Sequence, residues 1–463
     1  MPAKDPRLNS CAATDAHDIQ QAPGRAPKPS VAEHGSSLHS IRDQKQRELL
    51  PLTCTEDAKG RLCLGDQGVR EILAEVGTPA FLIDENGLRA TAQHYLRAFQ
   101  SRHAQVEVIY ASKALPCPAI ANLFSQEGLG CDVASFGELS MALAAGVPPA
   151  RIVVHGNAKT DHYLEAALDA RAGTIVIDAL DELDRLERLV RTPVSVLVRV
   201  NPRVSVATHA AITTADEASK FGVPSADVSA ALDRVRRHPL LRLEGLHLHL
   251  GSQLFQLDAF REAVRELSRY DAMPTYDLGG GLGVRMTAAD PEGPSIDEYA
   301  QAIVTAVHTY LGPDNRLIVE PGRSLVARSV ISAYTVLSVK RTGSRTFVAV
   351  DGGMGESLLA RLTGAQFAPF LLDKSGEMES CDVVGPHCEN GDSLARQVSL
   401  SEPSVGDILI VPVTGAYCPA LANNFNAMLR PPLVLCSRGS HRVVARRETV
   451  DDLLDRHQVL AGP

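Results

Sequence analysis

The chain has 463 residues, of which 44% are hydrophobic and 22% are charged, and its formal net charge is −9. These proportions are typical of globular domains and exclude a fully disordered chain, a collagen-like fibre and a coiled coil. The acidic balance argues against a chain-wide affinity for nucleic acid, and the absence of tryptophan predicts an aliphatic core.

The first segment, residues 1–47, is rich in proline, alanine, serine, histidine and glutamine and poor in large apolar residues. This composition predicts a flexible tail. The tail has no apolar region like that of a secretory signal. No part of the chain approaches the run of about 18 consecutive apolar residues that a membrane span requires. Nine scattered cysteines without a C-x-x-C pair are typical of reduced thiols. We therefore expect a cytoplasmic protein.

Residues 81–325 alternate short β-branched runs with longer stretches rich in alanine and leucine. Eight runs predict strands, at 106–110, 130–133, 152–155, 174–178, 194–201, 243–250, 276–278 and 317–319. The stretches 136–145, 161–170 and 259–270 predict helices, with Ser135 and Asp161 as candidate N-caps. Eight strands joined by helices favour an α/β fold with a (β/α)8 TIM-like barrel over the alternative, an open doubly wound sheet.

After the barrel the sequence largely loses its helical periodicity, and residues 326–463 predict a mostly antiparallel β-domain that ends in a helix. The predicted strands are 325–340, 347–350, 380–384 and 407–413, and the predicted helix is 448–460. Residues 48–80 precede the first barrel strand, and we expect this N-terminal segment to pack with the β-domain.

Polar residues follow all eight predicted barrel strands, and in such barrels the active site lies at these strand ends. The groups are Lys113 after the first strand, Asp132 after the second, and His155, Asp178, Arg199, His247 with His249, Asp277 and Glu320 after the others. The eight strands therefore direct polar side chains to one mouth.

Four of these features together match the requirements of pyridoxal 5′-phosphate. Lys113 offers an amine for a Schiff base, and the glycines at 279–281, with Ser252, offer backbone N–H groups for a phosphate. His249 offers a flat ring to cover one face of the cofactor, and Glu320 offers a partner for the pyridine nitrogen. Each alone has a simpler explanation, as a solvated lysine, a tight turn or a structural histidine, but the set favours the cofactor.

Eight motifs carry a resemblance to a known family. They are YASK at 110–113, HGN at 155–157, SKFG at 219–222, HLHLGSQ at 247–253, DLGGGLG at 277–283, EPGR at 320–323, HCENGD at 387–392 and GAY at 415–417. In this order they resemble the pyridoxal-phosphate-dependent decarboxylases of the alanine-racemase-like barrel fold, the ornithine, diaminopimelate and arginine decarboxylase family. The chain is most similar to the diaminopimelate decarboxylases, over about residues 65 to 457.

The resemblance implies a role for each residue that matches a family motif. Lys113 is implied as the Schiff-base lysine, His249 as the residue that stacks on the cofactor ring, and Glu320 as the partner of the pyridine nitrogen. Further implied cofactor contacts are Asp132, Ser252, Gly280, Gly281 and Tyr417, and implied substrate contacts are Arg323, Glu389 and Tyr417. The resemblance also implies a homodimer with shared active sites, in which Cys388 and Glu389 enter from the second subunit and Cys388 donates a proton to the α-carbon.

One stretch departs from the diaminopimelate decarboxylases, which carry an arginine and, four residues later, a tyrosine that hold the distal end of the substrate. Leu359 and Thr363 stand at these positions, Arg361 lies two residues off, and Phe425 replaces a common tyrosine. Loss of an arginine–carboxylate contact leaves a buried carboxylate unpaired, at a cost on the order of 1–3 kcal/mol. We therefore expect a different or conjugated amino acid as substrate. The alternative is meso-diaminopimelate, the substrate of L-lysine biosynthesis.

Three other functions remain as rivals. An amino-acid racemase on the same barrel would present an arginine to the pyridine nitrogen, and Glu320 argues against it. A non-catalytic homologue that binds the cofactor would be expected to lose Lys113 or Cys388. A metal-dependent hydrolase could use His247 and His249, but we expect no carboxylates at the other strand ends to complete a ligand set, and hence no metal.

Overall fold

The computed structural model describes residues 44–201 and 219–459. The predicted flexible tail lies outside these residues except for its last four, which form the short helix α1 (Gln44–Arg47). Within the described ranges, no helix is long and apolar enough to cross a membrane. None of the eight cysteines in these ranges forms a disulfide with another of them.

Eight parallel strands form a closed barrel, which confirms the predicted fold and shows that the open sheet is wrong. The barrel closes because the last strand pairs with the first, with Leu317 opposite Val106. In chain order the strands are β5 (Val106–Ala111), β6 (Gly130–Val133), β7 (Ile152–Val154), β8 (Thr174–Ile177), β9 (Val194–Arg199), β10 (Leu241–His247), β11 (Thr275–Asp277) and β12 (Arg316–Val319).

Aliphatic side chains fill the barrel, as the composition predicts. One compact cluster takes a single buried residue from each of five strands: Ile109, Val153, Val176, Leu197 and Ile318. Their neighbours along each strand point outward into the larger core beneath the helices, because side chains alternate across a strand.

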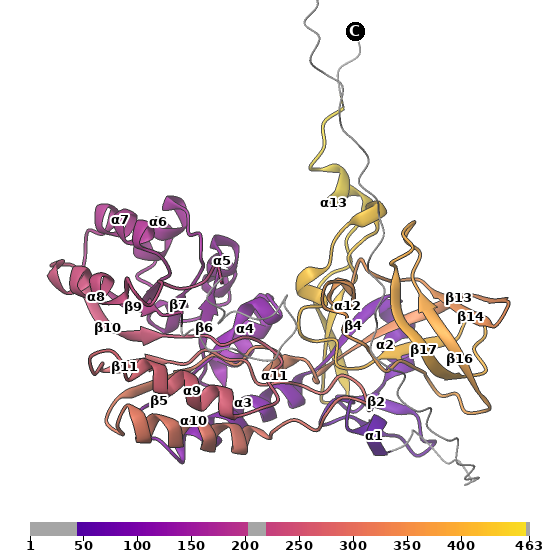
Figure 1. The fold of residues 1–463 in the computed structure, drawn as a ribbon. Helices are drawn as coiled ribbons and strands as arrows, with labels where there is room; N and C mark the ends of the chain where they lie inside the picture. Colours follow the sequence, from indigo (N-terminus) through magenta and orange to yellow (C-terminus); the bar gives the residue numbers. More distant parts are fainter. Residues whose placement is uncertain (1–43, 202–218, 460–463) are drawn as a thin grey trace, which may run out of the picture. The chain divides into compact units, whose positions relative to one another are not determined.

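The outer layer consists of α3 (Glu85–Gln100), α4 (Pro118–Gln126), α5 (Phe136–Ala144), α6 (Asp161–Asp169), α7 (Leu180–Leu189), α8 (Val228–Arg237), α9 (Asp258–Leu267) and α10 (Ile296–Tyr310). Figure 1 shows α3, α9 and α10 beside one another outside the strands. Ser135 caps α5 as predicted, by accepting a hydrogen bond from the Glu138 N–H. The predicted cap Asp161 is wrong: Thr160 caps α6, and Asp161 is its first helical residue, where a carboxylate suits the helix dipole.

A second, mixed and mostly antiparallel sheet confirms the predicted β-domain. Its strands are β4 (Ala80–Asp84), β13 (Val330–Thr342), β14 (Arg345–Val350), β15 (Phe370–Leu371), β16 (Met378–Val384), β17 (Ser393–Ser401), β18 (Ile408–Val411), β19 (Leu433–Ser437) and β20 (Ser440–Ala445). The final helix, α13 (Val450–Leu454), is shorter than predicted.

Three features of this sheet differ from expectation. The run predicted as one strand from residue 325 begins instead with a helical turn, α11 (Arg323–Val326). The prediction missed the two-residue strand β15, and it missed β17, β19 and β20, whose sequences alternate polar and apolar residues only in part. Although β4 lies at the start of the range expected for the barrel, it pairs with β13 and β19, because its five buried residues fit the centre of the second sheet.

The N-terminal segment forms β1 (Thr55–Glu56), β2 (Leu62–Leu64), β3 (Gln67–Gly68) and α2 (Val69–Val76). Its buried residues, such as Leu64 and Ile72, share one hydrophobic cluster with Leu82, Ile331 and Phe370 of the second sheet. This packing arises because α2 buries Val69, Ile72 and Leu73 on a single face.

A buried ion pair ties the loop after β7 to α7. The Nζ of Lys159 donates to Glu182 Oε1 at 2.7 Å and to the backbone oxygens of Gly156 and Val176 at 2.8 and 2.7 Å. Both charged side chains are at most 1% exposed. Replacing Glu182 by alanine leaves the ammonium buried and unpaired, so we expect the free energy of unfolding to fall by about 3–5 kcal/mol in chemical denaturation.

The matched control is an ion pair on the surface, Arg341–Glu379, whose side chains are 61% and 31% exposed. Removing Glu379 is expected to change the free energy of unfolding by less than about 1 kcal/mol. Equal losses in the two variants would show that burial of Lys159 and Glu182 adds nothing to stability.

Candidate active site

A cavity of about 540 Å³ lies at the carboxyl ends of the barrel strands, within the size range of small-molecule sites. The barrel contributes Lys113, Ala134, His155, Gly156, Asn157, Arg199, Phe221, His247, His249, Ser252, Glu320 and Arg323. The connections of the second sheet contribute Leu359, Leu362, Thr363, Tyr417 and Leu421. The predicted convergence of strand ends on one mouth is therefore present.

Lys113 lies in the single 3-10 turn η1 (Ser112–Ala114) that follows β5. Its Nζ lies 3.3 Å from the Oδ2 of buried Asp132, at the end of the neighbouring strand β6. Burial would lower the pKa of Lys113, but the negative groups around it, Asp132 first and then Tyr417 and Glu320, together hold the pKa above its usual value. The amine is thus held at a defined place in the cavity.

The glycine run after β11 brings backbone close to its neighbours. Gly279 and Gly281 adopt φ angles of +61° and +122°, which side chains rarely tolerate. A Cβ on Gly280 would lie 2.3 Å from the carbonyl oxygen of Glu320, and one on Gly281 would lie 2.7 Å from that of Gly251. Only glycine therefore fits along this stretch.

Ser252 lies next to this run and lines a small corner of the site together with Gly251, Gly281, Arg323 and Tyr417. Its Oγ accepts hydrogen bonds from the Nε and Nη2 of Arg323, each at 3.2 Å. The corner thus combines a hydroxyl, a guanidinium and glycine backbone, which are groups that bind phosphate.

The ring of His249 is fixed against the same run, because its Nδ1 accepts a hydrogen bond from the N–H of Gly280 at 3.2 Å. Burial, followed by the positive charge of Lys113, lowers the pKa of His249 well below its usual value. His249 is therefore a neutral, flat ring with a set orientation, which suits stacking on an aromatic ligand.

Tyr417 approaches the cavity from the second sheet. Its N–H donates to the carbonyl oxygen of Ala114 at 2.8 Å, and its φ is +66°, so a strained residue is tied to the turn that carries Lys113. The guanidinium of Arg323 lies 4.8 Å from the centre of the Tyr417 ring. These contacts bring two predicted substrate residues together.

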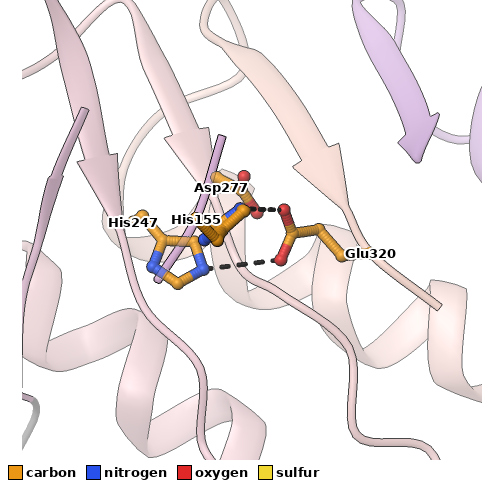
Figure 2. A group of neighbouring side chains, drawn as sticks. All are labelled: His155, His247, Asp277 and Glu320. Atoms are coloured by element: carbon orange, nitrogen blue, oxygen red, sulfur yellow. Dashed lines mark hydrogen bonds and ion pairs between the residues drawn. The ribbon is translucent and has the colours of Figure 1, made fainter. Parts of the chain in front are cut away.

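Glu320 lies among three polar residues from other strand ends, His155, His247 and Asp277 (Figure 2). His155 Nε2 lies 2.6 Å from Glu320 Oε1, and His247 Nε2 lies 3.5 Å from Glu320 Oε2. Burial would raise the pKa of Glu320, but the histidines, His155 first, hold it well below its usual range. Burial and then the charge of Glu320 raise the pKa of Asp277 well above its usual value.

This group corrects one expectation. The sequence analysis predicted that no carboxylates would complete a ligand set with the histidines, yet the ligand atoms of these four residues all lie within 4.8 Å of one another. His249, one of the two histidines proposed for a metal, is not part of the group.

Among the described residues, several buried polar atoms at the barrel strand ends lack a hydrogen-bond partner. They are both ring nitrogens of His247, Asp277 Oδ2 and Asp132 Oδ1. Because buried polar atoms are almost always paired, this wall is suited to a polar ligand. An amine, a glycine-lined anion corner, a neutral flat ring and an ionised carboxylate all face the site, and these groups fit pyridoxal phosphate.

The far wall of the cavity is formed by α12 (Leu358–Thr363), which presents Leu359, Leu362 and Thr363. Arg361 is not among the lining residues. Its Nε lies 2.7 Å from the position of a Cβ built on Gly391, so the guanidinium lies against the loop after β16. Arg361 therefore does not take the place of the arginine expected at residue 359.

Cys388 and Glu389 do not join the other predicted site residues. Neither lines the cavity, and the thiol of Cys388 is exposed. The loop that carries them is organised by buried Asp392, whose Oδ2 accepts from the N–H and Nδ1 of His387 at 2.8 and 2.9 Å. On its other side, the N–H of Cys388 donates to Asn426 Oδ1 at 3.0 Å.

The structure adds residues that the sequence analysis did not assign to the site. Arg199 lines the cavity, lies 3.2 Å from Asp178 Oδ1, and covers the ring of Phe221 at 4.6 Å. The available signal was the position of Arg199 at the end of a barrel strand. Nothing in its spacing, however, indicated that Phe221 in the SKFG motif would be its partner.

Residues 88–327 match the model of a family described as pyridoxal-dependent decarboxylase, pyridoxal binding domain. The chain is 42% identical over 410 residues to the diaminopimelate decarboxylase of Actinosynnema pretiosum subsp. auranticum, covering 86% of this chain and 93% of the relative. It is 36% identical over 428 residues to that of Bacillus subtilis (strain 168), covering 87% and 96%.

Solved structures show the same similarity. The diaminopimelate decarboxylase of M. jannaschii in complex with L-lysine superposes with a TM-score of 0.83 at 29% identity, over 88% of this chain and 98% of that one. The Helicobacter pylori enzyme complexed with L-lysine gives a TM-score of 0.79 at 30% identity, over 84% and 98%.

Proposed function

The chain belongs to the pyridoxal-dependent decarboxylases and is a carboxy-lyase that uses pyridoxal 5′-phosphate, and we propose that Lys113 is the residue that joins this cofactor covalently. The reaction resembles that of diaminopimelate decarboxylase and removes the α-carboxylate of an amino acid as CO2. The observation that carries the proposal is the meeting of Lys113, Gly281 and Glu320 around the small corner of the site.

Bound pyridoxal 5′-phosphate supplies an electron sink that accepts the electron pair left when the substrate loses CO2. Ser252, Gly280 and Gly281, assisted by Tyr417, would hold the phosphate, and His249 would cover one face of the ring. Glu320 would keep the ring nitrogen protonated, which strengthens the sink. Asp132 would hold Lys113 in place, and Arg323 would orient the substrate.

We further propose a homodimer in which Cys388 and Glu389 complete the site of the other subunit. Supporting this, the loop that carries them is rigidly built, yet it does not line the cavity of its own chain. In the completed site Cys388 would deliver a proton to the α-carbon, and Glu389 would contact the substrate. A reducing, cytoplasmic location suits a free, exposed thiol with this role.

We infer the class of substrate from the residues that α12 presents to the cavity. Leu359 and Thr363 offer no cation to a distal carboxylate, and Arg361 is turned away. This supports a substrate other than meso-diaminopimelate, either a different amino acid or a conjugated one. The curated relatives favour the alternative, a diaminopimelate decarboxylase of lysine biosynthesis. CO2 release from a panel of α-amino acids and their conjugates, with meso-diaminopimelate included, tests both, and absence of CO2 release from the whole panel would contradict the proposed activity.

The double variant Leu359→Arg, Thr363→Tyr gives a sharper result. If the far wall sets specificity, this variant gains about tenfold or more in kcat/KM for meso-diaminopimelate, because a bidentate arginine then meets the distal carboxylate. Steady-state kinetics measure the ratio of kcat/KM values for meso-diaminopimelate and the preferred substrate.

The control variant is Leu362→Arg on the same helix face, which adds the charge one turn away from residue 359. For this control, the gain in kcat/KM for meso-diaminopimelate, expressed as a change in activation free energy, is expected to be less than half of that in the double variant. High wild-type activity on meso-diaminopimelate, with no gain in the double variant, would rule out the altered specificity.

A further inference from the structure

We propose that His155 is a positioning residue for this reaction, because it holds the Glu320 carboxylate in the orientation that meets the cofactor nitrogen. His247 lies beside the other oxygen of the same carboxylate. The inference rests on the proposed function and adds to it, since only Glu320 was assigned a role there. His155 and Glu320 lie 165 positions apart in the chain and meet only in the closed barrel.

The contact between these residues has the properties of a strong orienting bond. His155 Nε2 and Glu320 Oε1 are 2.6 Å apart, and the side chains are 7% and 3% exposed. An ionised carboxylate can only accept, so the imidazole donates. A charge-assisted hydrogen bond that excludes water is stronger and more directional than a neutral one on the surface.

His155 is itself held in place, so it can impose a geometry. Its backbone N–H donates to the carbonyl oxygen of Val133 at 2.7 Å, which extends the pairing of β6 and β7 past the end of β7. Its ring packs edge-on against His247, with centroids 4.8 Å apart and an angle of 64° between the planes. His155 is therefore an anchored donor rather than a mobile one.

The consequence for Glu320 concerns its last torsion angle. The terminal torsion of a glutamate side chain is broad, so an unanchored carboxylate samples many orientations. With Oε1 occupied by His155, the second oxygen points toward His247, whose Nε2 lies 3.5 Å away (Figure 2). Burial lowers the pKa of His247 to about 3, so this neighbour is neutral and does not neutralise Glu320.

Two other carboxylates face the pair. Asp132 Oδ1 lies 3.9 Å from His155 Nε2, and Asp277 belongs to the same group. The raised pKa of Asp277 indicates its neutral form, so it adds no competing negative charge beside Glu320. The Glu320 carboxylate is thus held in one orientation before the ligand arrives, which is the arrangement that preorganised sites require.

The test measures the Kd of pyridoxal 5′-phosphate for the apoprotein by absorbance titration, in addition to turnover. His155→Asn keeps a polar side chain but is too short to reach Glu320, whereas His155→Gln places an amide N–H near the position of Nε2. We expect His155→Asn to raise the Kd about tenfold and to lower kcat with little change in KM, and His155→Gln to recover most of both.

Glu320→Gln supplies the reference for coupling. If His155 acts through Glu320, adding His155→Asn to Glu320→Gln changes the Kd by less than about twofold, whereas independent roles give the full additional loss. The control for loss of a buried histidine is His103→Asn, remote from the cavity, where the ring nitrogens contact Asn315 O at 2.8 Å and His308 Nε2 at 3.0 Å.

The control is expected to leave the Kd unchanged. Additive effects of the His155 and Glu320 changes, or an unchanged Kd in His155→Asn, would overturn the inference. The inference would also be overturned if the active wild-type protein held one equivalent of tightly bound metal and His155→Asn removed that metal. His155, His247, Asp277 and Glu320 would then serve as metal ligands. Failure of the wild-type protein to bind pyridoxal 5′-phosphate would instead contradict the proposed function, so the two failures are distinguishable.

Discussion

Replacing Lys113 by alanine is expected to lower kcat/KM by at least about 10³-fold, because the covalent attachment of the cofactor is lost. The visible absorbance of the protein-bound cofactor should disappear in the same variant. The fold should persist, since the side chain of Lys113 is 41% exposed and is not part of the hydrophobic core. Absorbance spectra, kinetics and thermal unfolding of one preparation measure the three effects.

The matched control is Lys340→Ala, which removes an exposed lysine from β13. It is expected to change neither spectrum nor rate. If Lys113→Ala kept both the wild-type absorbance and the wild-type rate, another amine would hold the cofactor and the assignment of Lys113 would fail.

The second large effect is expected for Cys388→Ala, with a loss of about 10²–10⁴-fold in kcat, the usual contribution of a general acid. Cofactor absorbance should remain, because Cys388 does not line the cavity that contains Lys113 in its own chain. Cys54→Ala, at another only partly buried cysteine, is the control and should retain full activity.

Mixing the two inactive variants tests whether the sites are shared. A mixed dimer of Lys113→Ala and Cys388→Ala subunits contains one site in which both groups are intact, so random pairing should restore about a quarter of wild-type activity. No recovery, despite exchange of differently tagged subunits, would mean that Cys388 acts within its own chain or takes no part.

Much of the barrel was predictable because its signal is local. Parallel strands buried on both faces require short β-branched runs, and the helices between them require longer stretches with one apolar face. The second sheet was predicted less completely. Its strands β17 and β20 are partly exposed, so their patterns are weaker. The run predicted as a strand from residue 325 begins with the helical turn α11 (Arg323–Val326), which follows closely after β12.

The same distinction applies to the site. Lys113, Glu320 and the glycine run could be predicted as site residues because each follows a barrel strand, and strand ends meet at one mouth in this fold. Arg199 and Phe221 were missed as a pair, and so was the group around Glu320, because their partners lie far away in the chain. Spacing along a sequence carries no information on which way such side chains point.

The sequence by itself therefore determined the barrel, the cofactor chemistry and the identity of the residue types at the strand ends. Only the tertiary structure decided that His155 bonds Glu320, that Arg361 lies against Gly391, and that Cys388 is absent from its own cavity. The physical reason is that secondary structure follows from local periodicity, whereas these contacts depend on barrel closure and on the direction of each side chain once distant segments have packed.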